Sequence, residues 1–200
     1  MKPYFDTNHA VGLVLLLLTL VWLTMEGAKY SQQRENPREG ATRVGSVTAW
    51  RLSVLACAVV TNVALYAAPH IVSGAAIRPA AVAASIGLVV MLAGIVLRGW
   101  SFLTLGDYFT FTVQVSDDQQ VVHAGPYRLL RHPSYAGILL ICAGVGLTGA
   151  NWAGLAVVVL LPLALLLYRI HIEEGALLST LGDRYRDYAT GRKRLIPLVW

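Results

Sequence analysis

Five runs of hydrophobic residues alternate with polar segments along the chain. Each run comes close to the roughly 20 apolar residues that an α-helix needs to cross the hydrocarbon core of a bilayer. The pattern therefore predicts an all-α integral membrane protein with about five transmembrane helices. The expected spans cover residues 10–25, 52–68, 79–97, 135–150 and 152–168.

The polar segments predict how these spans are connected. Only a short turn around Asn151 separates the last two runs, so we expect them to form an antiparallel helical hairpin. Segment 30–47 is expected to be a surface loop, and 106–134 is the longest polar segment. The apolar pattern of the third span can continue to Leu105.

The charges predict an orientation in the membrane. The chain is 56% hydrophobic and only 14% charged, and its net charge of +5 comes from basic residues near span ends and in the tail, so nucleic-acid binding is not indicated. With five spans, Lys2 and Arg78 lie on one side and all other Lys and Arg on the other. The positive-inside rule makes the second side cytoplasmic, with the N-terminus outside and the C-terminus inside. The basic tail residues 192–194 are expected to attract anionic headgroups.

Several kinds of site lack support in the sequence. Cys57 and Cys142 both lie within apolar runs, which favours core packing over a disulfide or a metal ligand. The histidines show no metal-ligand spacing with one another or with a thiolate. The sequence also contains no glycine-rich phosphate loop and no serine nucleophile elbow.

One polar segment, 125–137, is enriched in groups that can bind a ligand. It contains two arginines, a histidine and two tyrosines between apolar stretches. The residue before a proline is biased away from helix, and a proline suits the first turn of a helix. His132-Pro133 therefore predicts a helix that begins at Pro133, with His132 at its N-terminus near the membrane surface.

The helical hairpin predicts which other polar residues lie near His132. Arg169 and Glu173 follow the last span and share one face if the helix continues. The hairpin then brings them to His132 and Tyr135 in one patch, although a solvated ion pair remains an alternative. Arg98, at the end of an apolar run, is either a functional charge or a residue that snorkels to the headgroups.

These residues resemble the signature of the isoprenylcysteine carboxyl methyltransferase family, whose relatives include membrane phospholipid N-methyltransferases. The resemblance covers roughly residues 90–197. Its first half is Gly-Pro-Tyr-Arg-x-x-Arg-His-Pro-x-Tyr-x-Gly at 125–137. Its second half is Glu173-Glu174-x-x-Leu177, then Gly182-x-x-Tyr185-x-x-Tyr188, then Arg194 and Pro197.

The resemblance implies a membrane enzyme that uses S-adenosylmethionine and has one domain, with two N-terminal spans in 1–78 and the catalytic core in 79–200. The segment before the fourth span and the C-terminal helix would form a cytoplasmic cofactor pocket. Arg169, with Arg98 in support, would hold the substrate carboxylate. By position, the cofactor contacts would be Gln114, Gln119, Gln120, Val121, Val122, Tyr127, His132, Pro133, Ser134, Tyr135 and Glu173.

The chemistry of the candidate residues favours a carboxyl acceptor on a lipophilic molecule that enters from the bilayer. A carboxylate is already ionised at neutral pH, so positioning by two guanidinium groups suffices. An amine acceptor, such as a phospholipid amine, would need a base to remove a proton. A small membrane transporter or binding protein is a further alternative, but the chain lacks the internal repeats typical of transporters.

Overall fold

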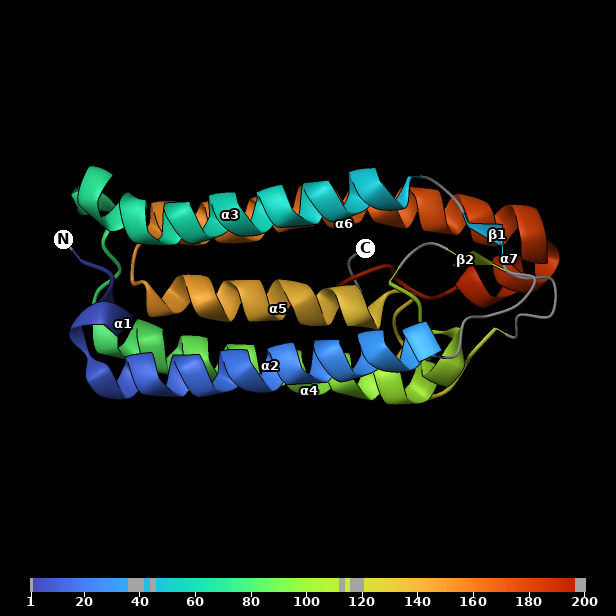
Figure 1. Ribbon diagram of the computed structural model, residues 1–200, viewed down its shortest axis with the longest axis horizontal. Helices are drawn as coiled ribbons and strands as arrows, with labels where there is room; N and C mark the ends of the chain where they lie inside the picture. Colours follow the sequence, from blue (N-terminus) through green and yellow to red (C-terminus); the bar gives the residue numbers. More distant parts are fainter. Residues whose placement is uncertain (1, 36–41, 44–45, 112–113, 116–120, 197–200) are drawn as a thin grey trace.

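The protein is a bundle of long helices that run along a common axis (Figure 1). The computed structural model describes residues 2–35, 42–43, 46–111, 114–115 and 121–196. Its long helices are α2 (His9–Glu35), α3 (Val47–Ile71), α4 (Ala80–Leu105), α5 (Pro133–Thr148) and α6 (Trp152–Leu181).

Short elements lie at the two ends of the bundle. α1 (Tyr4–Thr7) and the 3-10 turn η1 (Ser73–Ala75) lie at one end. The other end carries the 3-10 turns η2 (Gly106–Tyr108) and η3 (Gly125–Arg128), the helix α7 (Asp183–Ala189), and two short strands. β1 (Thr42–Arg43) pairs antiparallel with β2 (Gln114–Val115).

Four of these helices, α2, α3, α4 and α6, are long and apolar enough to cross a membrane. α5 is also apolar but is shorter, with 16 residues. Many large apolar side chains on the outer faces are exposed, for example Leu13 at 58% and Leu55 at 61%. Contiguous exposed apolar surface of this kind suits contact with lipid tails rather than water.

The first, second and last spans extend further than the hydropathy pattern predicts. α3 covers Val47–Ile71 rather than 52–68. The expected loop 30–47 is wrong at its start, because α2 continues to Glu35. Residues 31–35 are mostly polar, but none is a glycine or proline, and helix propensity does not require apolar side chains. α6 likewise continues from Tyr168 to Leu181 and ends at Gly182, whose φ of 55° suits a helix C-terminus. α4 ends at Leu105, as the pattern allowed.

The predicted antiparallel hairpin of α5 and α6 is confirmed, and Asn151 stabilises its turn. The Oδ1 of Asn151 accepts hydrogen bonds from the backbone N–H groups of Ala153 and Gly154 at 3.0 and 3.1 Å, which caps α6. Its Nδ2 donates to the carbonyl of Val72, so the same side chain ties the turn to the end of α3.

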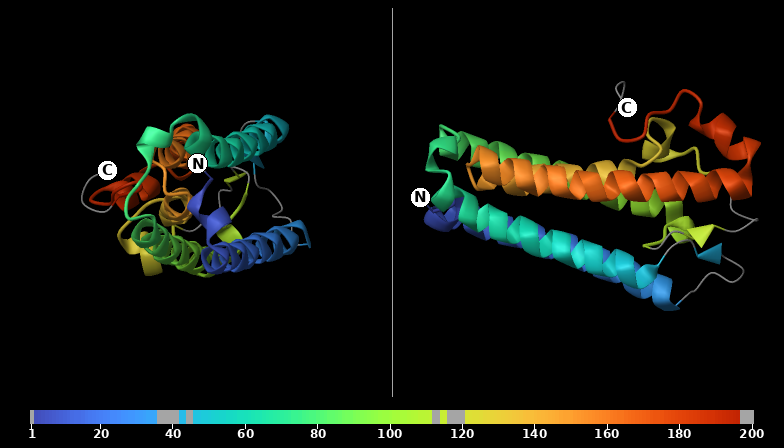
Figure 2. Two further views of the ribbon diagram at one scale, coloured as in Figure 1. Left: turned by 90° about the vertical axis from the view of Figure 1, so that its left-hand side faces the viewer. Right: turned by 90° about the horizontal axis from the view of Figure 1, so that it is seen from above.

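The bundle has two sides. Figure 2 shows α2 and α3 on one side of the bundle and α4, α5 and α6 on the other.

Glycines determine how closely α4 and α5 approach each other. The two helices pack backbone against backbone where Gly87 meets Gly144 and where Gly94 meets Gly137. A Cβ at Gly144 would lie 2.5 Å from the Gly87 carbonyl oxygen. Small residues commonly allow such close helix packing in membranes.

We expect Gly144→Ala to lower the free energy of unfolding by about 1–3 kcal/mol, because overpacking forces the backbones of α4 and α5 apart. Equilibrium unfolding in mixed detergent micelles measures this change. Gly175→Ala is the matched control, because a Cβ there meets nothing within 4 Å. Equal stability of the two variants would contradict the close approach of α4 and α5.

Candidate active site

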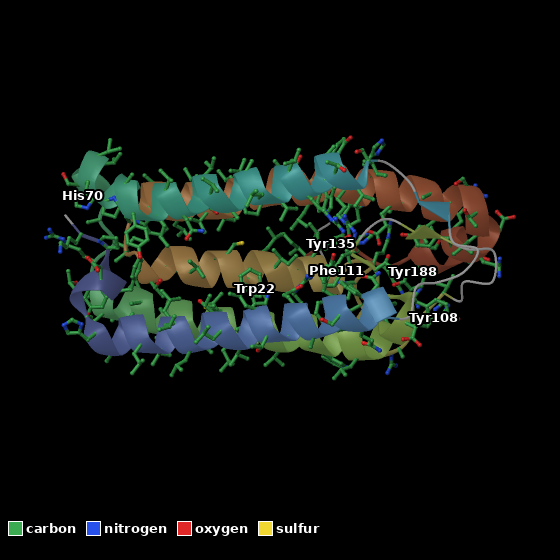
Figure 3. The ribbon with its side chains drawn as sticks, viewed as in Figure 1. Trp22, His70, Tyr108, Phe111, Tyr135 and Tyr188 are labelled. Atoms are coloured by element: carbon green, nitrogen blue, oxygen red, sulfur yellow. The ribbon has the colours of Figure 1, made fainter. Side chains whose placement is uncertain are left out.

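The polar signature lies at the end of the bundle opposite the α5–α6 turn. Figure 3 labels Tyr135, Phe111 and Tyr188 at this end, next to the start of α5 and the second half of α6. His132 is the residue before α5, and Pro133 occupies the first helical position, as the sequence predicts. This arrangement leaves the His132 ring at the N-terminus of a membrane helix.

Arg169, Tyr135 and Glu173 form a short hydrogen-bonded chain. The Nε of Arg169 donates to the hydroxyl oxygen of Tyr135 at 2.6 Å, and that hydroxyl donates to Oε2 of Glu173 at 2.6 Å. The phenol therefore links a cation to an anion that lies one helical turn further along α6. The sequence predicted that these residues and His132 would meet, and the structure brings them together.

Arg169 has two further contacts outside α5 and α6. Its Nη2 donates to the carbonyl of Phe111 at 2.8 Å, and its guanidinium lies 4.4 Å from the ring centroid of Trp50 at the start of α3. The side chain is only 6% exposed. Tyr135, Phe111 and Trp50 thus fix the guanidinium. The two hydrogen bonds use its Nε and Nη2 and not its Nη1.

Glu174, the neighbour of Glu173, holds three basic groups. Its Oε1 accepts from Nη1 of Arg131 at 3.0 Å and lies 3.2 Å from Nε2 of His132. Its Oε2 accepts from Nε of Arg194 at 2.9 Å. Because an ionised carboxylate can only accept hydrogen bonds, Nε2 of His132 carries a hydrogen in this contact. One face of the imidazole stacks on the ring of Tyr135, with 5.5 Å between the ring centroids.

The C-terminal segment pairs with the signature rather than with lipid headgroups alone. The backbone N–H groups of Arg131 and His132 donate to the carbonyls of Lys193 and Arg194 at 2.8 and 3.0 Å. The attraction of residues 192–194 to lipid headgroups stays a prediction beside these contacts within the protein. Arg194 pairs with the buried carboxylate of Glu174. Because this carboxylate has little access to water, its pairing with Arg194 competes with the attraction of Arg194 to a solvated headgroup.

Arg98 is engaged by a carboxylate from the first span. Its Nε and Nη2 donate to the two oxygens of Glu26, and its Nη1 donates to Oγ of Ser134 at 2.7 Å. The guanidinium also lies 4.7 Å from the ring centroid of Phe102. All three nitrogens of the guanidinium donate within the protein. Support of a substrate carboxylate by Arg98, which the resemblance implied, stays a prediction.

The remaining predicted cofactor residues fall into three groups. Tyr127 is buried in η3, and Val121 and Val122 are half-buried nearby in sequence, with Val121 packed on Tyr185 and Tyr188. Gln114 belongs to β2. Gln119 and Gln120 lie outside the described residues.

Burial keeps Tyr127 and Tyr188 at this end of the bundle neutral. Burial raises the pKa of Tyr127 well above its usual value and raises the pKa of Tyr188 to about 12. The hydroxyl of Tyr188 donates to the carbonyls of Tyr127 and Leu130 at 3.2 and 3.4 Å. α7 thereby fixes the backbone of η3.

Three contacts of the site were missed in the sequence. Glu26 is a carboxylate near the end of an apolar run, which by itself marks a functional candidate, so its signal was present. Trp50 and the carbonyl of Phe111 had no such signal, because they depend on the tertiary arrangement of α3 and of the segment after α4. The site thus draws on both sides of the bundle.

Together these contacts define a class of protein: a helical membrane protein with a charged site at one end of its bundle. The model of the isoprenylcysteine carboxyl methyltransferase family matches residues 86–179. This match confirms the resemblance over a range that contains the first signature and the Glu173–Leu177 part of the second, whereas Gly182 to Pro197 lie beyond it.

Two sequence relatives are named as protein-S-isoprenylcysteine O-methyltransferases. A protein-S-isoprenylcysteine O-methyltransferase of Tribolium castaneum is 37% identical over 117 residues, which are 58% of this chain and 42% of that protein. A probable protein-S-isoprenylcysteine O-methyltransferase of Oryza sativa subsp. indica is 31% identical over 57% of this chain and 61% of that protein. The chain thus matches about half the length of these curated relatives.

A solved structure extends the likeness to the first two spans. It is the structure of the eukaryotic intramembrane Ras methyltransferase isoprenylcysteine carboxyl methyltransferase without a monobody. The likeness has a TM-score of 0.61 and 25% identity, over 94% of this chain and 74% of that one. With the apolar helices, it supports an integral multi-pass membrane protein.

Proposed function

We propose that this protein transfers a methyl group from S-adenosylmethionine to the carboxylate of a lipophilic acceptor of the isoprenylcysteine type. The observation that carries the proposal is the hydrogen-bonded chain Arg169–Tyr135–Glu173. The phenol of Tyr135 lies between a guanidinium and a carboxylate and makes a hydrogen bond of 2.6 Å to each. One end of this chain suits an anionic acceptor and the other a cationic donor. The family match and the names of the relatives support the same reaction.

The donor set at this end fits S-adenosylmethionine, which when bound supplies an electrophilic methyl group on a sulfonium. Glu173 is half-buried and offers a carboxylate that favours a positive charge or accepts from ribose hydroxyls. Tyr127 and the stacked pair of His132 and Tyr135 provide aromatic surface for a purine or a cation. We keep these residues, with Pro133 and Ser134, as proposed cofactor contacts. The other predicted contacts stay part of the proposal: Gln114, Gln119, Gln120, Val121 and Val122.

Arg169 is proposed to orient the acceptor. Trp50, Tyr135 and Phe111 fix its guanidinium plane, so an acceptor carboxylate meets a preformed donor. Holding the acceptor oxygen in line with the methyl group can contribute up to about 7–11 kcal/mol to the lowering of the barrier. The acceptor is ionised before it arrives, so none of these residues has to remove a proton.

The orientation and the domain division are part of the proposal. The site faces the cytoplasm, where basic residues gather by the positive-inside rule. The N-terminus then lies outside and the acceptor enters from the surrounding bilayer. Segment 79–200 contains the proposed catalytic core.

A labelled-methyl assay tests the reaction and its closest rival. Purified protein is incubated with S-adenosylmethionine labelled in the methyl group and with a prenylated or fatty carboxylic acid. We expect a product that releases volatile methanol in base. Labelled lipid that is stable to base would instead indicate N-methylation of a lipid amine. Absence of any transfer and of cofactor binding would overturn the proposal and favour a transporter or binding protein.

We expect Glu173→Gln to weaken binding of S-adenosylhomocysteine and S-adenosylmethionine about tenfold or more, because a charge-assisted contact contributes roughly 1.5–3 kcal/mol. The loss should be larger for S-adenosylmethionine, since only the sulfonium form carries the extra positive charge. Isothermal titration calorimetry measures both affinities. Asp183→Asn is the control, because Asp183 pairs only with Arg186 among the contacts the structure gives it and is highly exposed. Equal losses for the two ligands would place Glu173 away from the sulfonium.

A further inference from the structure

Helix α2 carries a polar face within an otherwise apolar span. Trp22, Glu26, Lys29 and Gln33 follow one another at spacings of four, three and four residues, which places them on one side of a helix. This face contacts the second half of the chain: Lys29 donates to the carbonyl of Gly106, and Gln33 accepts from the backbone N–H of Phe111. α2 lies outside the segment 86–179 that matches the family model.

The strongest of these contacts is the pair of Glu26 and Arg98. Both carboxylate oxygens of Glu26 accept from the guanidinium, and the indole N–H of Trp22 donates to Oε1 at 2.7 Å. Arg98 is 5% exposed, and the side chain of Glu26 is 18% exposed. A two-point contact of this kind fixes the plane of the guanidinium and not only its distance.

The fixed guanidinium reaches the start of α5. Its remaining amino group, Nη1, donates to Oγ of Ser134 at 2.7 Å and to the carbonyl of Ser134 at 3.3 Å. Ser134 lies between His132 and Tyr135, and it is 4% exposed. The direction of Nη1 therefore determines how the first turn of α5 presents these two rings.

We infer that Glu26 is a positioning residue of the cofactor site, acting through Arg98 on Ser134. The inference rests on the proposed function and extends it, because it assigns to the first span a part in cofactor binding. A pair that only stabilised the bundle would not need the third guanidinium nitrogen to be directed at Ser134, the residue just before Tyr135.

The test compares Glu26→Gln with Glu26→Asp and with Thr24→Ala. Glutamine keeps the shape but loses the charge and one of the two hydrogen bonds accepted from Arg98, whereas aspartate keeps the charge. Thr24 is exposed on the same helix, and among the described residues its hydroxyl donates to the carbonyl of Val21 within α2. Binding of S-adenosylhomocysteine is measured by calorimetry, KM and kcat by methyl transfer, and folding by thermal unfolding in the same detergent.

We expect Glu26→Gln to raise the Kd of S-adenosylhomocysteine and the KM for S-adenosylmethionine about tenfold. The kcat and the KM for the acceptor should stay within about threefold of wild type, because Arg169 is held by other residues. Glu26→Asp should recover most of the affinity, and Thr24→Ala should match wild type.

Two outcomes would overturn the inference. If Glu26→Gln unfolds at a lower temperature but binds the cofactor like wild type, the pair serves stability alone. If Glu26→Gln does not fold, the double variant Glu26→Gln/Arg98→Gln removes both buried charges, and normal cofactor binding by that variant excludes positioning. A wild-type protein that binds neither ligand overturns the proposed function itself, whereas normal wild-type binding with unaffected variants overturns only the role of Glu26.

Discussion

Replacement of Arg169 by alanine is expected to lower kcat about 10²–10³-fold, the usual cost of removing one preorganised electrostatic contact from an active site. The guanidinium is held by Tyr135, Phe111 and Trp50, so it is rigid before the acceptor arrives. Without it the acceptor carboxylate loses its orientation. The Kd of S-adenosylhomocysteine should stay within about threefold of wild type, because the proposed cofactor contacts lie on the Glu173 side.

Two further variants separate orientation from charge. Arg169→Lys keeps a positive charge but lacks the planar fork, so it should recover little of the lost activity. Tyr135→Phe removes the hydroxyl that links Arg169 to Glu173 and should affect both kcat and cofactor affinity. Single-turnover rates and calorimetry provide the two measurements. Full activity of Arg169→Lys would mean that charge, rather than geometry, is what the acceptor requires.

Glu174→Gln is expected to lower the free energy of unfolding by about 3 kcal/mol, the lower end of the cost of breaking a buried ion pair. The carboxylate is 7% exposed and binds Arg131, His132 and Arg194. The lower end applies because the side chains of Arg131 and Arg194 are 21% and 38% exposed and retain some access to water. Cofactor affinity should fall as well, because His132 loses the partner that orients its ring.

The structural and the chemical parts of this effect can be separated. Limited proteolysis reports whether residues 190–196 detach from the signature, and calorimetry reports cofactor binding. Arg194→Gln is the matched variant, because it removes the tail's ion pair with Glu174 but leaves Glu174 bound to Arg131 and His132. We expect it to release the tail while retaining most of the cofactor affinity. Equal loss of affinity in both variants would assign the effect to the tail rather than to His132.

The comparison of sequence and structure shows which interactions a linear pattern can reveal. The hairpin and the meeting of His132, Tyr135, Arg169 and Glu173 followed from a short turn and helical spacing, which are local properties. The pairing of Arg194 with Glu174 did not, because the tail returns to the signature through backbone hydrogen bonds that have no local sequence signal.

Arg98 illustrates the same limit within a single residue. Its position in an apolar run indicated either a functional charge or a side chain that snorkels to the headgroups. Neither interpretation predicted which residue pairs with Arg98. The structure supplies Glu26 from a span 72 residues away. An isolated charge in a span indicates that a partner exists, but only the packing of α2 on α4 determines which residue it is.

The sequence by itself determined the membrane class, the hairpin and the family resemblance, because hydropathy, turn length and short signatures are readable along one chain. Only the tertiary structure decided that Arg98 is neutralised by Glu26, that Glu174 gathers three basic groups, and that Arg98 of α4 donates to Ser134 at the start of α5. The physical reason is that a buried charge must be compensated by whichever opposite charge the packed helices bring to it.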